Sequence, residues 1–326
     1  MLRDSFNRIH DYLRISLTNN CNLRCFYCMP EEDYVSTPSA QLMQAEEIEE
    51  ITRIFVVLGV KKIRLTGGEP LVRKDAAAII ESISKHPVQL TLTTNGTRLH
   101  DFLPVLTSAG IQSVNVSLDT LDPEKFNLIT RRDQYNRVMT NIALLTQNGI
   151  HAKVNVVVMK GVNDTEITDF VKWTHHLPVH IRFIEFMPFS GNHWEVDKVF
   201  GLKQILEVID GEFAYIKLKD EAHDTAKKYM VPGHAGTFAI ISTITQPFCG
   251  DCNRMRLTAD GKMKNCLFST EETDLLSALR RGENIVPLIH ACIAGKKEER
   301  GGQFAKNMEE IDSVHMKNRS MISIGG

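Results

Sequence analysis

The first 190 residues alternate between short runs rich in β-branched residues and longer amphipathic stretches. Such runs are typical of strands, and the stretches between them have helical spacing. Strand-then-helix units form parallel sheets through right-handed crossovers. The sequence therefore predicts an α/β fold, either an open doubly wound sheet or a full or partial (β/α) TIM-like barrel. The six predicted strands cover residues 12–17, 61–66, 88–94, 111–118, 151–159 and 180–187.

Two of the predicted helices show how these units are bounded. Residues 45–59 place Ile48, Ile51 and Phe55 on one stripe and stop at Gly59, and residues 98–110 also stop at a glycine. A glycine just past the last apolar position is a common helix end. In parallel α/β folds, ligands gather at the carboxyl ends of the strands, so we expect the functional site there.

The alternation fails after Met187, where a polar, glycine-containing connection begins. We place a boundary near Gly191, with a barrel core over residues 1–190 and a C-terminal α+β extension over 191–326. The extension has a predicted short helix at 202–209, an apolar run from Gly236, and a hairpin turn in "ADGK" at 259–262. Helical stretches over 271–295 and a polar tail ending in "MISIGG" complete it.

Composition excludes several classes of protein. A formal net charge of −2 argues against nucleic-acid binding, and no apolar run is long enough to span a bilayer. The first residues, "MLRDSFNRIHDYLR", lack both the apolar centre of a secretory signal and the acid-poor character of a transit peptide. We therefore expect a cytoplasmic protein without membrane or nucleic-acid partners.

Six of the seven cysteines lie in two tight groups. In a chain of this length they indicate metal ligands in a reducing compartment rather than a disulfide framework. The first cysteine group is Cys21, Cys25 and Cys28, in a Cys-x₃-Cys-x₂-Cys frame that follows the first predicted strand. The second cysteine group is Cys249, Cys252 and Cys266, and the predicted hairpin brings its last member back beside the other two.

Ligand number separates two kinds of metal site. A structural zinc site uses four protein ligands, whereas three thiolates on a 4Fe-4S cluster leave one iron open. Three thiols in each group favour two open clusters. The alternative is zinc with a fourth ligand elsewhere, such as His290 or Cys292. The second group alone supports either interpretation equally well, and the first group is more specific.

The first group resembles the radical S-adenosylmethionine superfamily. Tyr27 is the aromatic residue before the last cysteine, and "TGGEP" at 66–70 follows the second predicted strand as the glycine-rich segment of that superfamily does. The resemblance implies a 4Fe-4S cluster whose open iron chelates the methionine moiety. It also implies that an electron from that cluster cleaves S-adenosylmethionine to a 5′-deoxyadenosyl radical.

Further features resemble one family within the superfamily, the GTP 3′,8-cyclases of molybdenum cofactor biosynthesis. They are the second cysteine group, Arg254 and Arg256 in "CNRMRL", and the terminal Gly325 and Gly326. The likeness extends from "LRISLT" to the terminal glycines. It implies that GTP is converted to (8S)-3′,8-cyclo-7,8-dihydroguanosine 5′-triphosphate, with two 4Fe-4S clusters and S-adenosylmethionine as cofactors.

The resemblance also implies a role for individual residues. The first cysteine group would hold the cluster that binds S-adenosylmethionine, and the second group the other cluster. The S-adenosylmethionine contacts would be Tyr27, Gly68, Ser117 and Met187. The GTP contacts would be Arg14, Arg64, Thr93, Lys153, Arg254 and Arg256. Catalytic roles would fall to Arg254, Arg256, Gly325 and Gly326.

The residues themselves support a triphosphate held by side chains. No Gly-x₄-Gly-Lys-Ser/Thr loop occurs, so discrete Arg and Lys side chains would have to bind phosphate. Arg14, Arg64 and Lys153 lie in predicted strands, where alternation can point them inward. Lys62 and Arg182 are weaker candidates. The spacing to Ser117 favours Thr93 over Thr94, which alignment alone does not separate.

The resemblance implies three protein partners. They are a reductase or flavodoxin-type electron donor, cyclic pyranopterin monophosphate synthase as the acceptor of the product, and a second copy of the chain, since it allows a homodimer. Two other interpretations remain open. One is a different radical S-adenosylmethionine enzyme with an auxiliary cluster, such as a peptide modifier, and the other is a non-enzymatic zinc-binding module.

Overall fold

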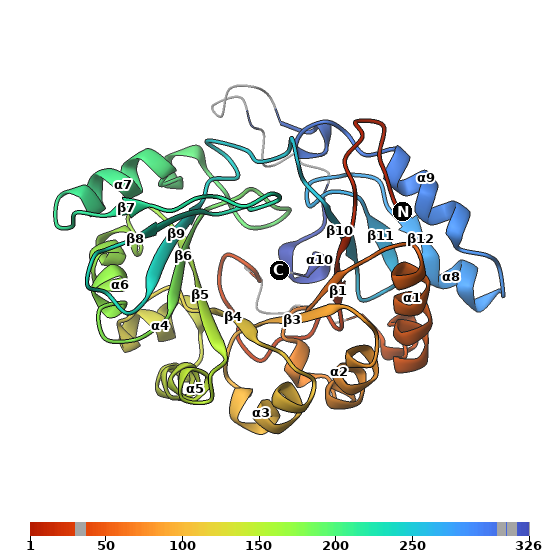
Figure 1. Cartoon of the computed structure of the whole chain (residues 1–326), viewed down its shortest axis with the longest axis horizontal. Coiled ribbons are helices and arrows are strands. Elements are labelled where there is room, and N and C mark those ends of the chain that lie inside the picture. The colour runs from red at the N-terminus through yellow and green to blue at the C-terminus, as the bar shows by residue number, and fades with distance from the viewer. Residues whose placement is uncertain (30–36, 305–310, 312–317, 326) are drawn as a thin grey trace.

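One twelve-stranded sheet forms the frame of the protein in a computed structural model that describes residues 1–29, 37–304, 311 and 318–325. The strand order is β12-β11-β10-β1-β2-β3-β4-β5-β6-β9-β8-β7. Figure 1 shows the sheet curved into an arc that is open on one side. The first six strands are β1 (Tyr12–Ser16), β2 (Lys62–Thr66), β3 (Gln89–Thr94), β4 (Ser113–Ser117), β5 (His151–Val158) and β6 (His180–Glu185).

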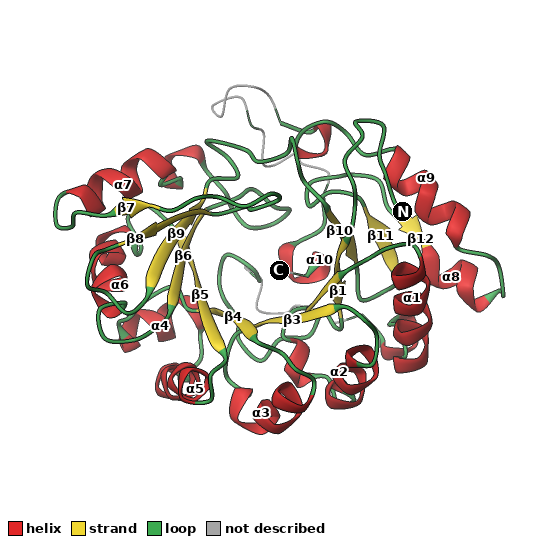
Figure 2. Ribbon diagram, viewed as in Figure 1, coloured by secondary structure: helices red, strands yellow, loops and turns green. Residues whose placement is uncertain are grey.

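These six strands confirm the predicted alternation, and all of them pair in parallel. The helices between them cover the outer face of the arc (Figure 2). They are α1 (Ala45–Val57), α2 (Ala76–Ser84), α3 (Leu99–Ser108), α4 (Pro123–Thr130), α5 (Tyr135–Gln147) and α6 (Ile167–Trp173). The stripe predicted in α1 is buried at Ile48, Ile51 and Phe55, so apolar periodicity sets which face packs on the sheet.

The C-terminal residues extend the sheet at both ends. β9 (Thr237–Ile241) pairs in parallel with β6, and β10 (Arg254–Leu257) pairs in parallel with β1. Antiparallel strands lie beyond them: β7 (Ile216–Lys217), β8 (Lys227–Met230), β11 (Lys262–Lys264) and β12 (Thr273–Asp274). No ladder joins β7 to β12 in the described part of the chain. The barrel is therefore partial, and the boundary near residue 190 stays a prediction.

The predicted hairpin between β10 and β11 is confirmed. The helical stretch expected at 271–295 consists of two helices preceded by β12. A turn separates them because Gly282 takes a positive φ of 74° and the Asn284 side chain accepts a hydrogen bond from the Val286 amide. The remaining helices are α7 (Leu202–Asp210), α8 (Leu275–Arg280), α9 (Val286–Ala294) and α10 (Met321–Ile324).

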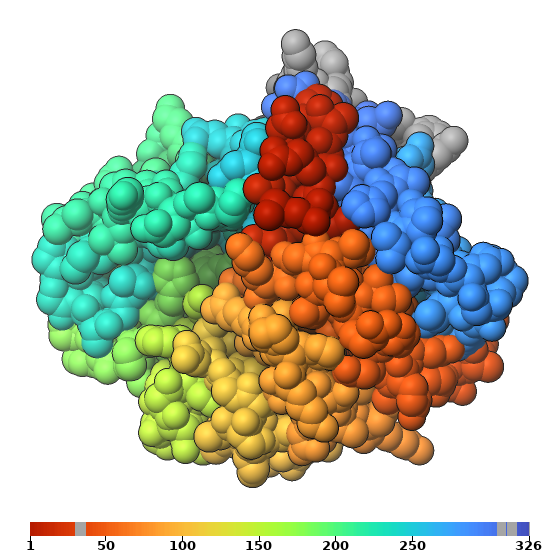
Figure 3. Space-filling view, turned by 45° about the vertical axis from the view of Figure 1, so that its right-hand side comes forward, coloured from red at the N-terminus to blue at the C-terminus, as the bar shows by residue number. Residues whose placement is uncertain are grey.

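The N-terminal segment and α10 lie on different sides of the sheet edge formed by β1 and β10 (Figure 1). The first residues pack beside the C-terminal segments on the surface (Figure 3), and α10 lies inside the arc (Figure 1). Arg8 fixes the N-terminal segment, since its guanidinium donates to the backbone oxygens of Cys249 and Glu298 at 2.8 and 2.7 Å. Among the described residues, no helix has the length and apolarity needed to cross a membrane.

Candidate active site

The first cysteine group lies in the loop after the carboxyl end of β1. Cys21 Sγ accepts hydrogen bonds from the Leu23 amide at 3.4 Å and from Asn95 Nδ2 at 3.7 Å. The three thiols line a pocket whose wall also includes Tyr27, Gly68, Ser117 and Met187, all predicted S-adenosylmethionine contacts. The chain therefore brings together this whole predicted set at one end of the sheet.

Buried carboxylates surround this first pocket. Glu69 is fully buried and accepts hydrogen bonds from the Asn95 amide and Thr94 Oγ1, and burial raises its pKa to about 7. Asp119 accepts a hydrogen bond from Tyr27 Oη at 2.6 Å, and burial raises its pKa to about 6. Burial, then the charge of Glu69, raises the pKa of Cys21 to about 11.

The glycines of "TGGEP" serve a packing role that the sequence analysis did not identify. A Cβ at Gly67 would lie 2.6 Å from the Thr18 oxygen, and one at Gly68 would lie 2.5 Å from the Asn20 oxygen. The Gly68 amide donates to the Thr18 oxygen at 2.7 Å. These glycines let their own backbone approach the loop that carries the first cysteine group.

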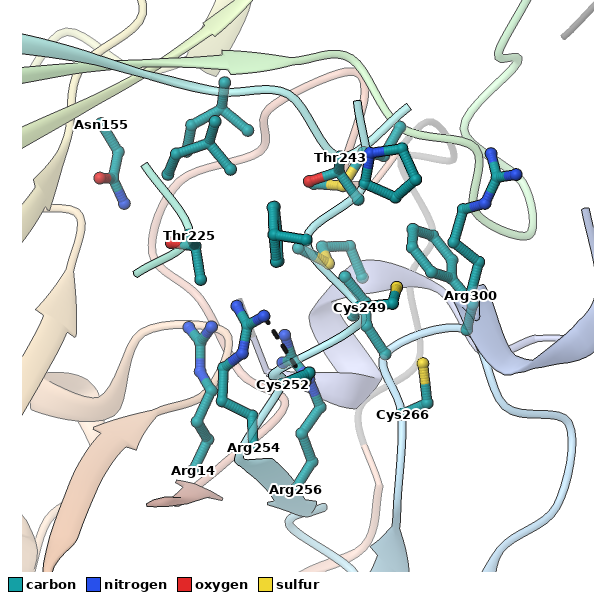
Figure 4. A pocket seen from close by; sticks show the side chains of 18 of the residues that line it. Arg14, Asn155, Thr225, Thr243, Cys249, Cys252, Arg254, Arg256, Cys266 and Arg300 are labelled. Atoms are coloured by element: carbon teal, nitrogen blue, oxygen red, sulfur yellow. Dashed lines mark hydrogen bonds between the residues drawn. The ribbon is translucent and has the colours of Figure 1, made fainter. Parts of the chain in front are cut away.

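The second cysteine group lines a neighbouring pocket (Figure 4). Cys249 and Cys252 share a tight turn just before β10, and Cys266 follows β11. Two cations reach Cys252 Sγ, since Arg254 Nη2 donates at 3.6 Å and Lys296 Nζ at 3.5 Å. Burial raises the pKa of Cys252, but the charges of Arg254 and Lys296 outweigh it and lower the pKa to about 6.

Neither of the fourth zinc ligands considered above, His290 or Cys292, lines the second cysteine pocket. Cys292 is buried, and its thiol contacts the Met263 oxygen at 3.8 Å. In each group, three sulfur donors line one pocket, and that donor set fits a 4Fe-4S cluster with one open iron.

Cations form two rows across adjacent strands. Arg14 on β1 stands in register with Arg64 on β2 and with Arg256 on β10. One pleat away, Tyr12 stands in register with Lys62 and Arg254. Figure 4 shows Arg14, Arg254 and Arg256 extending side by side from these strands into the pocket. Arg14 and Arg64 therefore both point into the arc, as strand alternation predicts.

These cations share a third pocket, the cation pocket. It is lined by Tyr12, Arg14, Lys62, Arg64, Lys153, His180, Arg182, Lys228 and Arg254, with Asp224 and other residues. Burial, then the charge of Arg182, lowers the pKa of Lys153 to about 8. Burial, then the charge of Arg64, lowers the pKa of Arg182 to about 10. The pocket therefore disfavours its own positive charges and suits an anion.

Tyr12 is a site residue that the sequence analysis missed. Arg64 Nε donates to Tyr12 Oη at 2.5 Å, and Lys62 Nζ lies 5.1 Å from the ring centroid. Burial raises the pKa of Tyr12, but Arg64, Arg14 and Lys62 lower it to about 7. Its place two residues before Arg14, on the same face of a strand, is the signal that could have identified it.

Thr93 and Thr94 point to different partners. Thr93 Oγ1 accepts a hydrogen bond from Arg64 Nη1 at 3.3 Å, whereas Thr94 Oγ1 donates to Glu69 at 2.8 Å. Thr93 therefore contacts a cation-pocket residue, and Thr94 contacts a carboxylate beside the first cysteine group. Two buried amide oxygens, Asn115 Oδ1 and Asn155 Oδ1, have no hydrogen-bond partner and were also missed.

The chain terminus reaches the centre of the site. The Gly325 oxygen accepts a hydrogen bond from Arg256 Nη1 at 2.5 Å. Gly325 has a φ of 85°, and a Cβ there would lie 2.9 Å from Ser16 Cβ. A residue with a side chain would be both strained and crowded at this position. Gly326 lies outside the described residues.

The three pockets share their walls. Arg14, Asn115, Arg182 and Arg254 line both the cation pocket and the second cysteine pocket. The second pocket in turn shares its walls with the first. The residues common to both are Asn155, Ile184, Met187 and Met321. An elongated ligand can therefore extend from the cations, past the second cysteine group, toward the first.

Two family profiles match the chain. The Radical SAM superfamily matches residues 15–174, and Molybdenum Cofactor Synthesis C matches residues 179–301. "GTP 3',8-cyclase" of Peptoclostridium acidaminophilum is 40% identical, over 100% of this chain and 98% of its own length. "GTP 3',8-cyclase, mitochondrial" of Arabidopsis thaliana is 45% identical, over 100% of this chain and 84% of its own. This chain belongs to the GTP 3′,8-cyclase family.

Other members of the family are longer. "Molybdenum cofactor biosynthesis protein 1" of Mus musculus is 46% identical over 99% of this chain and 51% of its own length. The chain thus spans about half the length of the mouse and bovine relatives. As a GTP 3′,8-cyclase family member within the radical S-adenosylmethionine superfamily, the chain is expected to use S-adenosylmethionine and a 4Fe-4S cluster.

The fold is similar to that of a protein solved with S-adenosylmethionine. "Crystal structure of Streptococcus suis SuiB bound to S-adenosylmethionine" aligns with a TM-score of 0.63 and 16% identity, over 95% of this chain and 72% of that one. At this identity the likeness concerns the fold alone. It agrees with the partial barrel described above.

Proposed function

We propose that this chain is itself a GTP 3′,8-cyclase, which converts GTP to (8S)-3′,8-cyclo-7,8-dihydroguanosine 5′-triphosphate in the first step of molybdenum cofactor biosynthesis. One observation carries the proposal. Two groups of three cysteines face pockets with shared walls, and a third pocket rich in cations adjoins the second. This arrangement provides for two clusters and for one substrate with a polyanionic end.

In this proposal each cysteine group holds one 4Fe-4S cluster. When bound, the first cluster supplies the electron that splits S-adenosylmethionine, and the second supplies an open iron beside the guanine. Tyr27, Gly68, Ser117 and Met187 would hold S-adenosylmethionine in the pocket that they line. Asp119 would orient Tyr27 through their hydrogen bond.

The cation pocket would bind the triphosphate. Burial and the charge of neighbouring cations lower the pKa of Lys153 and Arg182. Phosphate oxygens at Arg14, Arg64 and Lys153 would offset this repulsion and accept charge-assisted hydrogen bonds. Lys62 and Arg182 line the same pocket and would add to its charge. Arg254 and Arg256 border the second cysteine pocket, so they would contact the nucleotide next to its base.

The proposed reaction balances as an isomerisation of GTP. The C3′–H bond breaks and its hydrogen atom leaves in 5′-deoxyadenosine, then a bond forms between C3′ and C8. One electron from the reductase or flavodoxin-type donor, or from dithionite in vitro, and one proton from solvent then reduce the resulting base radical, so the product has the composition of GTP. The chain's own contribution is to hold the ribose toward the first pocket, to hold the base beside the second, and to exclude water. Gly325 would take part by placing backbone groups next to Arg256.

An anaerobic assay with GTP, S-adenosylmethionine and dithionite tests the proposal. We expect 5′-deoxyadenosine and a new nucleotide with the mass of GTP but a different retention time. If 5′-deoxyadenosine forms without the new nucleotide, the chain is a radical enzyme with another substrate, such as a peptide. If reconstitution with iron and sulfide gives no visible absorption, the zinc-binding interpretation is favoured.

The remaining assignments are part of the same proposal. The chain would receive electrons from a reductase or flavodoxin-type donor and pass its product to cyclic pyranopterin monophosphate synthase, alone or as a homodimer. A cytoplasmic location is supported by seven free cysteines, since a reducing compartment keeps thiols unpaired. Residues 1–190 would form the radical core and residues 191–326 the extension that carries the second cluster.

A further inference from the structure

Lys296 is a buried lysine beside the second cysteine group. It follows the C-terminal end of α9 and is only 4% exposed. Its Nζ donates to Cys252 Sγ at 3.5 Å and to the Arg254 oxygen at 3.0 Å. Lysine is among the residue types that are almost never buried unless they are paired.

No carboxylate accounts for this burial. Within the described residues, Lys296 makes no ion pair with Asp or Glu, and its hydrogen bonds go to one sulfur and one backbone oxygen. The sulfur belongs to a residue that our proposed function assigns to the second cluster. A cluster held by thiolates is negatively charged, so it would supply the counter-charge that the structure otherwise lacks.

Among the described residues, no cation donates to a sulfur atom of the first cysteine group. The Leu23 amide and the Asn95 side-chain amide donate to Cys21 Sγ and are neutral, and Arg24 donates to the backbone oxygens of Cys21 and Leu23 instead. Glu69 and Asp119, which are acidic, line or border that pocket instead. The two groups therefore differ in the charge of the side chains next to their sulfur atoms.

We propose that Lys296 is a charge-balancing residue that raises the reduction potential of the cluster held by the second cysteine group. A cluster gains one negative charge on reduction, and a cation hydrogen-bonded to a ligand sulfur stabilises the more negative state. The second cluster would then accept an electron more easily than the first. The inference rests on the proposed function, because it requires a cluster at this site.

The test is a redox titration of the full-length, anaerobically reconstituted chain, followed by electron paramagnetic resonance. A variant with the first cysteine group changed to alanine assigns the signal of the second cluster. In Lys296→Met we expect the ratio of reduced to oxidised second cluster to fall about tenfold at a given potential, which corresponds to about 59 mV. Lys296→Arg should retain the potential of the unsubstituted chain.

Lys297→Met is the matched control, since Lys297 is the exposed neighbour and the change removes the same charge. It should leave both potentials unchanged. An unchanged potential in Lys296→Met, with the second cluster present, would overturn the inference but not the proposed function. If Lys296→Met loses the second cluster and Lys296→Arg keeps that cluster, the result supports the inference. If both variants lose the second cluster, the inference is overturned. No second cluster in the unsubstituted chain would overturn both.

Discussion

The two cysteine groups face adjoining pockets but differ in the charged side chains next to them. Around the first group, burial and the carboxylates of Glu69 and Asp119 raise the pKa values of the thiols. Around the second group, Arg254 and Lys296 lower the pKa of Cys252 to about 6 despite its burial. Burial raises the pKa of Cys249 in the second group as well, so the difference between the groups lies at Cys252, whose sulfur accepts hydrogen bonds from two cations.

This difference follows from the strands that supply each surrounding. The first group lies beside the loops after β2, β3 and β4, and the loops after β2 and β4 supply the carboxylates Glu69 and Asp119. The second group is reached from β10 and from the end of α9, which supply cations. The acidic side chains next to the first pocket and the basic side chains next to the second therefore come from different strands and loops.

The largest expected effect comes from removing either group. Changing the first group to alanine should abolish the cleavage of S-adenosylmethionine, and changing the second should abolish the cyclised product. Each variant should keep about half of the iron and sulfide, because each group binds one cluster. Metal analysis and product chromatography measure these outcomes. Loss of all iron from one variant that remains folded would mean a single shared site.

The second largest effect is expected from the C-terminal glycines, because Gly325 contacts Arg256 in the wall of the second cysteine pocket. Deleting Gly325 and Gly326 should abolish product while iron content and S-adenosylmethionine binding stay intact. Gly325→Ala should have a similar but weaker effect, because its Cβ would meet Ser16. Gly282→Ala is the control, since its φ of 74° brings the same strain with nothing within 4 Å. Full activity in the deletion variant would exclude a role for the tail.

Substitutions in the cation pocket should weaken the binding of GTP but not that of S-adenosylmethionine. Arg14→Ala and Arg64→Ala should each weaken GTP binding by roughly 1.5–3 kcal/mol, through loss of a charge-assisted hydrogen bond. S-adenosylmethionine affinity should be unchanged in both. Calorimetry measures the two affinities, and Arg53→Ala, on the exposed face of α1, is the control. Equal weakening of both ligands would mean that the pockets are not electrostatically separate.

The smallest effect concerns stability and pH. The folded pKa of Lys153, about 8, lies below its ordinary value of 10.5, so the unfolded chain binds more protons between these values. Stability should therefore rise as pH increases from 8 to 10.5. Lys153→Met should raise the free energy of unfolding by about 1–2 kcal/mol at pH 7 and by less at pH 9.5.

Chemical denaturation of the cluster-free chain at both pH values measures this change. Lys160→Met is the control, because Lys160 is exposed at the other end of β5. If Lys153→Met raises the free energy of unfolding equally at both pH values, the gain comes from packing rather than from removal of a buried charge.

Much of this arrangement is predictable from sequence because it rests on local periodicity. The strands carrying Arg14, Arg64 and Lys153 were identified by β-branched runs, and alternation predicted that their cations point inward. The extent of the sheet was not predictable, since it depends on pairing between strands that are far apart in the chain, β10 with β1 and β9 with β6. Tyr12 and Lys296 were missed because their roles arise from tertiary neighbours, not from a motif.

The pairing of β1 with both β2 and β10 has a consequence for synthesis. β10 begins at Arg254, so β1 keeps an unpaired edge until most of the chain has been made. An unpaired edge strand is a template for pairing with other chains, and contacts of long sequence separation form slowly. A nascent or truncated chain that ends before β10 should therefore aggregate through the strand that leads into the first cysteine group.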